Sequence, residues 1–191
     1  MTRRSTGPWR LSAISSATTE LWAAIALAAE HESPLWADSL RPPAERDTTP
    51  VFSALAEERF ALGLETIYEG YLLHYGEPRL FSPEDVDTAL LLGDYLYAEG
   101  LVRVAALEEV LAVSDLAELI SLCAQLRAEN RQGDGLAWAA TAAWLGHGEL
   151  EPAREALRAE SDSGPLAELA RTAAGDEAIG ATLGAHLARV R

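Results

Sequence analysis

The chain has 191 residues, of which 30 are acidic and 15 are lysine or arginine, so its formal net charge at pH 7 is −15. This charge argues against binding to nucleic acid or to an anionic membrane surface, because both attract basic proteins. Alanine and leucine dominate, and no stretch alternates polar and apolar residues as a half-buried strand would. The sequence therefore predicts an all-α, single-domain antiparallel helical bundle with a substantial buried core.

The first thirty residues predict a tail followed by a helix. We expect residues 1–13 to form a disordered tail, and an amphipathic helix to begin at Ala17 or Thr18 and to end at Glu30. The apolar run 21–29 is much shorter than the roughly 20 residues that a membrane-spanning helix needs. We therefore expect a cytoplasmic protein without stable membrane insertion, with residues 14–191 forming the helical bundle.

Residues 32–50 are rich in proline and polar residues, which interrupt helical periodicity. A surface linker is the simplest interpretation of this Pro-rich loop. The alternative is a loop that covers the mouth of the bundle, anchored by Trp36 and Leu40. Residues 51–130 are then expected to hold the core helices, and residues 131–191 the short C-terminal helices.

Two apolar helices separated by a short turn dominate the stretch 60–109. The first places Ile67 and Tyr71 on an apolar stripe with spacings of three and four, which favours burial. In the second helix, Ser82 is expected to be the N-cap and Pro83 the first helical residue.

A glycine followed by an aspartate interrupts the apolar run of the second helix. Glycine costs about 1 kcal/mol relative to alanine in a helix interior, so we expect close helix contact at Gly93 and a partner for the carboxylate of Asp94. The candidate helix-contact or pocket residues in these two helices are Glu65, Tyr71, His74, Gly93, Asp94, Tyr95 and Tyr97. A histidine at a helix C-terminus also favours the helix dipole, which is the simpler interpretation of His74.

Further helices are expected after residue 110. One should begin at Ser114 as its N-cap and run to about Asn130, with a buried stripe of Leu116, Leu119, Ile120, Cys123 and Leu126. A buried thiol is the expected state of Cys123. Residues 142–156 read like one tetratricopeptide helix pair, but a solenoid needs at least three repeats. We therefore expect a helical hairpin that closes the bundle, followed by a last helix over 176–190.

The sequence of the second apolar helix resembles a known family. Its segment Leu90–Leu101, LLLGDYLYAEGL, is similar to the helix of trans-polyprenyl diphosphate synthases that carries Gly-Asp-x-Leu-x-Ala. The preceding helix, ending at His74, resembles the family's helix that leads into an aspartate-rich DDxxD motif. Here the residues that follow are Tyr-Gly-Glu-Pro-Arg, so the aspartates are missing. The resemblance covers residues 60–130 and implies a truncated isoprenoid-synthase-like bundle.

The missing motif bears on chemistry, because Mg²⁺ bound by paired carboxylates holds the diphosphate in this family. The family's second acidic motif is also absent, and Leu40-Arg41-Pro42 is at best a remnant of its Gly-Gly-Lys-Arg segment. The resemblance thus implies a degenerate, non-catalytic member without a cofactor, similar to the small subunit of two-component heptaprenyl diphosphate synthases. Such a subunit would dock on a catalytic synthase subunit, or pair with itself, and act in isoprenoid biosynthesis.

Two alternatives remain open from the residues alone. The chain can be an unrelated all-α protein-interaction module, which predicts that Asp94 lies on the surface. It can also be a Mg²⁺-dependent prenyl diphosphate or terpene enzyme that uses atypical acids: Glu69, Glu77, Asp85 and Asp94. Of these, Glu77, Asp85 and Asp94 are the weak metal candidates, although an acid at a helix start, such as Asp85, more often serves the helix itself. The hypothesis of a non-catalytic partner subunit predicts an exposed apolar face around Tyr95, Leu96 and Leu101.

Overall fold

The computed structural model describes the backbone of residues 9–190 and the side chains of residues 20–190. In this range the chain is helical, with two isolated antiparallel bridges (Leu40 with Phe81, Gly76 with Val190) and no strand. The longer helices are α1 (Trp9–Glu32), α3 (Ala61–Tyr75), α4 (Val86–Ala105), α5 (Val110–Ala128), α6 (Asp134–Ala143), α8 (Gly164–Ala174) and α9 (Asp176–Leu187). The short ones are α2 (Pro34–Asp38) and α7 (Glu151–Glu155), and the latter continues as a π-helical turn over Ala156–Glu160. The all-α prediction is confirmed.

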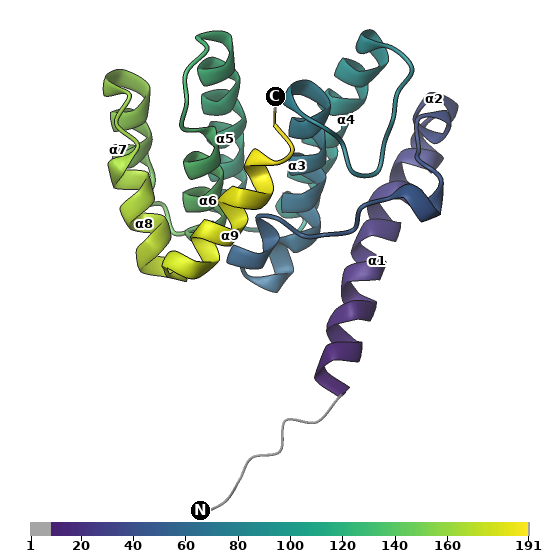
Figure 1. Cartoon of the computed structure of the whole chain (residues 1–191), viewed down its shortest axis with the longest axis horizontal. Helices are drawn as coiled ribbons and strands as arrows, with labels where there is room; N and C mark the ends of the chain where they lie inside the picture. The colour runs from purple at the N-terminus through teal and green to yellow at the C-terminus, as the bar shows by residue number, and fades with distance from the viewer. Residues whose placement is uncertain (1–8, 191) are drawn as a thin grey trace, which may run out of the picture.

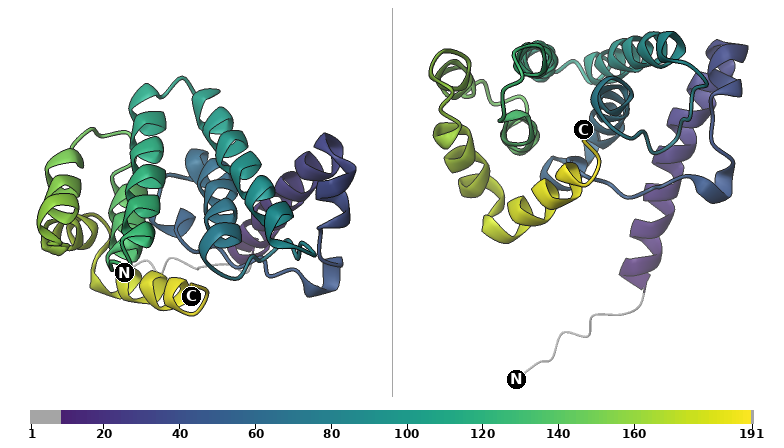
Figure 2. Two further views of the ribbon diagram at one scale, coloured as in Figure 1. Left: turned by 90° about the horizontal axis from the view of Figure 1, so that it is seen from above. Right: turned by 45° about the horizontal axis from the view of Figure 1, so that its top comes forward.

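The helices form antiparallel neighbours that stand side by side (Figure 1). Figure 2 shows α4 and α5 on one side of the molecule, α3 and α6 beneath them, and α9 crossing the opposite face of α3 and α6. The α7–α8 pair lies at one end, and α1 and α2 lie at the other. None of the described helices is long and apolar enough to cross a membrane.

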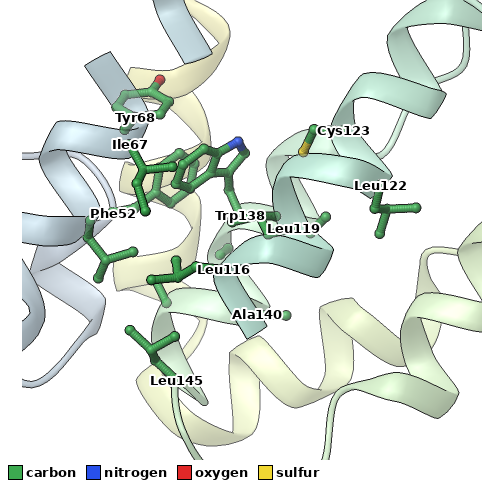
Figure 3. Close-up of a cluster of buried hydrophobic side chains, with 14 of the residues drawn as sticks. Phe52, Ile67, Tyr68, Leu116, Leu119, Leu122, Cys123, Trp138, Ala140 and Leu145 are labelled. Carbon is green, nitrogen blue, oxygen red and sulfur yellow. The ribbon is translucent and has the colours of Figure 1, made fainter. Parts of the chain in front are cut away.

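The main core is centred on the fully buried Trp138 of α6. Its indole ring packs against the rings of Phe52, Tyr68 and Tyr71, with centroid distances of 5.2, 5.1 and 5.6 Å. Figure 3 shows how side chains from α3, α5 and α6 meet around this ring. The predicted stripe of α5 is buried here, including the thiol of Cys123, and only Ile120 is partly exposed. Burial raises the pKa of that thiol well above its ordinary value, as expected for an unreactive core cysteine.

A second, smaller core joins α1 to α3 and α4. Trp22, Ile25 and Ala29 of α1 pack with Leu92 and Leu96 of α4 and with other apolar residues from α3 and the following loop. This packing explains why the amphipathic part of α1 is helical, since it buries one face against the hairpin.

Four glycines allow α3 and α4 to pack closely. Gly70 faces Gly93, and Gly63 faces Gly100, in antiparallel register two helical turns apart. A Cβ atom added to Gly93 would lie 3.2 Å from the carbonyl oxygen of Gly70 and closer still to the ring of His74. The prediction that Gly93 marks a close helix contact is therefore confirmed, and the glycine pairs set the spacing of the two helices.

Two predicted helix starts are wrong. The N-terminal helix begins at Trp9, so residues 9–13 are helical rather than a disordered tail, while residues 1–8 lie outside the described part. The helix expected from Ser82 begins instead at Val86, with Asp85 as its N-cap. The backbone N–H of Ser82 donates to the carbonyl of Ser39 (2.7 Å), so this residue is held in a short antiparallel pairing and cannot start a helix.

Other boundaries differ in smaller ways. The helix expected from Ser114 begins one turn earlier, at Val110. The Pro-rich loop 32–50 contains α2 and a 3₁₀ turn over Pro43–Glu45, and Trp36 packs on the second core as an anchor. The short C-terminal helices are present, and the last of them, α9, packs across α3 and α6.

A glycine substitution tests the close packing of α3 and α4. An alanine Cβ at Gly100 would lie 2.4 Å from Cγ1 of Ile67 and 2.9 Å from the carbonyl oxygen of Gly63. We expect Gly100→Ala to lower the free energy of unfolding by about 1–3 kcal/mol, because the helices must separate. Gly180→Ala is the control, since its Cβ would meet no atom within 4 Å, and it should leave stability equal or higher by up to about 1 kcal/mol. Urea denaturation measures both, and equal effects would contradict this account.

Candidate functional site

A cleft of about 830 Å³ lies between the first half of α4 and the second half of α5. The two helices diverge from their connecting turn (Figure 2), and the C-terminal end of α3 lies between them. The cleft is lined by residues 73–76 at the end of α3, by several residues of the loop 78–85, and by Arg41. From the two helices it is lined by Val86, Ala89, Leu90, Ala124, Arg127 and Ala128.

Small apolar side chains form the part of the cleft wall where α4 and α5 face each other, and polar and charged residues line the rest. Ala89 on α4 faces Ala124 and Ala128 on α5 across the cleft. At the edge, Val86 is 73% exposed and Leu90 is 42% exposed, although both are large hydrophobic residues. Exposed apolar side chains beside a recess are typical of a surface that a partner covers.

The loop beside the cleft is fixed by Arg79, whose side chain is fully buried. Its guanidinium donates to Glu65 (Nη1 to Oε2, 2.6 Å) and to Glu69 (Nε to Oε2, 3.0 Å), and it lies over the ring of Trp22 at 4.4 Å. Burial alone would lower the pKa of Arg79, but the charges of the two carboxylates raise it above its ordinary value. The arginine is therefore a permanent cation inside the fold.

The remaining carboxylate oxygens of this cluster hold backbone in place. Oε1 of Glu69 accepts the N–H groups of Arg79 and Leu80, both at 2.7 Å. Oε1 of Glu65 accepts the N–H of Val51 and both the N–H and the hydroxyl of Ser53. Glu65, a predicted pocket residue, is thus a buried structural residue, and it does not line the cleft.

Asp94 has the partner that the sequence predicted, but at the surface. Its Oδ1 lies 3.2 Å from Nε2 of His74, and the Asp94 side chain is 72% exposed. The two atoms are close, although their alignment is too poor for a hydrogen bond. Burial lowers the pKa of His74 below its ordinary value even with Asp94 nearby, and the His74 ring stacks on Tyr97 with centroids 5.1 Å apart. The imidazole ring of His74 is therefore uncharged at neutral pH and forms part of the cleft wall.

The prediction of an exposed apolar face around Tyr95, Leu96 and Leu101 is wrong in part. Leu96 is only 1% exposed, because it packs in the core between α1 and α4. Tyr95 is half-buried and stacks on Trp36 with centroids 6.0 Å apart. The large apolar residues that α4 does expose are Val86, Leu90, Leu91 and Val102, and the first two of these line the cleft.

Tyr71 belongs to a polar network behind the cleft that the sequence did not predict. Its hydroxyl donates to Asp134 and accepts from Arg127 (Nη2, 2.7 Å), which also donates to Asp134. His186 of α9 completes the network, because its Nδ1 lies 3.0 Å from the hydroxyl of Tyr68 and its Nε2 lies 3.5 Å from Asp134. The network ties α9 to α3 and α6. Burial would raise the pKa of Asp134, but the contacts with His186, Tyr71 and Arg127 hold it well below its ordinary value.

The weak metal candidates take part in other contacts. Asp85 is the N-cap of α4 and accepts the N–H and the hydroxyl of Thr88 at 2.8 and 2.9 Å, as expected for an acid at a helix start. The backbone N–H of Glu77 donates to the carbonyl of Arg189. Among the residues whose side chains are described, no three His, Cys, Asp or Glu side chains gather in an arrangement that could hold a metal ion.

Comparison of the chain with protein-family models, with curated proteins and with solved structures gave no match. The functional argument therefore depends on the cleft and on the residues around it.

Removing the buried cation Arg79 should lower the free energy of unfolding more than removing a surface arginine does. Arg79→Met leaves two buried carboxylates without a counter-charge, so we expect a loss of about 3–5 kcal/mol in the free energy of unfolding. Arg158→Met is the control, since Arg158 pairs with exposed acids such as Glu155, and it should cost about 0–1 kcal/mol. Chemical denaturation of both variants gives the comparison. We call the buried cluster of Arg79, Glu65 and Glu69 the clamp, and a loss below about 1 kcal/mol for Arg79→Met would contradict its role in fixing the loop.

The network around Asp134 should make stability depend on pH. The pKa of Asp134 is lower in the folded state than in the unfolded chain, where it is about 3.9. Its contribution is therefore fully present above that value and is lost as the pH falls below it. We expect Asp134→Asn to cost about 2 kcal/mol at pH 7, and the difference from wild type to shrink between pH 5 and pH 3. Asp176→Asn, at an exposed position, should show no such trend. A difference that stays constant with pH would contradict the assignment.

Proposed function

We propose that the chain is a non-catalytic binding subunit and that a helix of a partner protein docks in the cleft between α4 and α5. The observation that carries this proposal is the pair of exposed apolar residues, Val86 and Leu90, one turn apart at the edge of a recess that is lined in part by alanines. Covering them would contribute about 1.5–3 kcal/mol for each side chain that becomes fully buried.

The shape of the cleft favours a helix as the docked segment. Two diverging helices form its walls, and the small side chains of Ala89, Ala124 and Ala128 let a third helix approach closely. Amphipathic helices bind in such grooves through apolar residues spaced by three, four and seven. The well-fixed loop 78–85 and the close α3–α4 pairing supply a rigid receptor, which lowers the entropy cost of binding.

The sequence resemblance supplies the partner to test first. A catalytic polyprenyl diphosphate synthase subunit would fit the implied role of a degenerate relative, and the action would be physical: the chain would dock beside the partner's elongation cavity and help to set product length. Pairing of the chain with itself is the other arrangement that the resemblance implies.

A second candidate function is favoured by one specific observation. The exposure of Asp94 is the outcome expected of an unrelated all-α interaction module. That module would use the same cleft with a different partner, so the docking site does not depend on the resemblance. The enzyme alternative has less support, because Glu69 is bonded to Arg79 and Asp85 caps a helix.

Charge placed at the cleft edge should abolish docking. We expect Leu90→Glu to weaken binding at least tenfold, because the interface would bury an unpaired carboxylate. The matched control is Leu187→Glu, at a leucine of α9 that is 67% exposed, which should bind as wild type does. Both variants and the wild type are co-expressed with the catalytic synthase subunit of the same genome, and affinity is measured by biolayer interferometry.

The outcomes distinguish the location of the docking site from the identity of the partner. Binding lost only in Leu90→Glu supports docking of a synthase in the cleft. Equal binding by all three proteins contradicts the cleft as the docking site. If no form binds the synthase, the partner assignment fails, and the cleft is then tested with the peptide probes described below.

A further inference from the structure

Arg41 is an arginine that has no ion-pair partner among the residues whose side chains the structure describes, although the chain is strongly acidic. Its guanidinium makes no hydrogen bond or ion pair with the described residues, and Arg41 is one of the residues that line the cleft. The other arginines with described side chains each bond to a carboxylate or to a backbone carbonyl, as Arg59, Arg103, Arg171 and Arg189 do with acids and Arg46 does with a carbonyl. With twice as many acidic as basic residues in the chain, an unpaired arginine is unexpected.

The backbone around Arg41 is fixed rather than loose. The N–H of Arg41 donates to the carbonyl of Leu80 at 2.8 Å, and its own carbonyl accepts Nε of Arg46 at 2.8 Å. Leu40 forms an antiparallel bridge with Phe81. Since residues 79 and 80 are themselves held by Glu69, the position of Arg41 is set by the buried clamp.

The two acids that line the cleft together with Arg41 do not form an ion pair with it. Glu84 and Asp85 line the same cleft, but neither lies within ion-pair distance of the guanidinium. Asp85 is already committed to the first turn of α4 through Thr88. The cleft therefore presents an available cation beside apolar walls, and an arginine in this setting offers a planar fork of donors that matches a carboxylate.

We propose that Arg41 is a specificity-determining residue of the docking cleft and pairs with an aspartate or glutamate on the docked partner helix. This inference rests on the proposed function and adds the chemistry of the partner: an amphipathic helix whose apolar face enters beside Leu90 and whose end near the loop 78–85 carries an acid. The pair would be half-buried by the partner and so less screened than a surface ion pair.

The overall charge of the chain makes this inference easy to test. A protein of net charge −15 attracts basic peptides and repels acidic ones through its long-range field. A specific contact with Arg41 requires the opposite order of affinities, in which an acidic peptide binds more tightly than a basic one. We therefore use three synthetic 20-residue amphipathic helices of leucine, alanine and glutamine, identical except for one residue at the edge of the apolar face, which is Glu, Gln or Lys. Fluorescence anisotropy with labelled peptides measures the affinities at 0.15 M salt, for a scan of the position of that residue along the helix.

At one position of the scan, the Glu peptide should bind the wild-type chain about fivefold more tightly than the Gln peptide, and the Lys peptide should bind most weakly. In Arg41→Gln the preference for Glu should vanish, and in Arg41→Glu the Lys peptide should become the tightest. Arg171→Gln is the matched control, because Arg171 is an exposed arginine of α8 that does not line the cleft, and it should keep the wild-type order.

The variants also distinguish this inference from the proposed function. If all peptides bind equally and Leu90→Glu abolishes their binding, the docking cleft holds and the role of Arg41 is overturned. If the Lys peptide binds best at every position and Leu90→Glu has no effect, binding is non-specific, and both proposals are overturned for a helical partner. Circular dichroism checks that each variant is folded, as we expect, because the guanidinium of Arg41 makes no hydrogen bond or ion pair with the described residues.

Discussion

Complete burial of the Arg79 guanidinium is the constraint on which the rest of this structure depends. A buried charge is tolerated only when it is paired and its hydrogen-bonding groups are satisfied. Here two glutamates of α3, one turn apart, supply the opposite charge, and Trp22 supplies an aromatic face. Because the same carboxylates also accept four backbone N–H groups, satisfying the arginine fixes the segments before and after α3.

The cleft follows from this clamp together with the glycine pairs. The clamp fixes the loop 76–85 and therefore the point at which α4 can begin, one turn after Ser82. The glycine pairs then hold α4 close along α3. Since α5 must reach the core through Leu116, Leu119 and Leu126, it diverges from α4, and the recess between them is left open. The exposed Val86 and Leu90 are therefore a consequence of where α4 is made to start.

The parts of this arrangement that sequence reasoning found are those encoded locally. The apolar stripes of α3 and α5 and the small residue at Gly93 depend on neighbours one or two turns away, and periodicity reports them. Periodicity cannot report the ion pair of Arg79 with Glu65, because the two residues are 14 positions apart and are joined through a turn. It also cannot report the hydrogen bond between Tyr71 and Asp134, which are 63 residues apart. The false N-cap at Ser82 has the same cause, since a tertiary backbone pairing with Ser39 overrides a favourable local pattern.

The two glutamates also bear on what kind of chemistry this fold can carry. Paired carboxylates one turn apart on a helix are the arrangement with which a protein binds Mg²⁺ for diphosphate chemistry. Glu65 and Glu69 form such a pair on α3, but the guanidinium of Arg79 lies between them, and every one of their carboxylate oxygens is bonded within the fold. A metal ion at this position would have to displace a buried cation and release the loop that shapes the cleft. The internal ion cluster therefore fixes the loop beside the cleft, and the proposed docking of a partner helix depends on that rigidity.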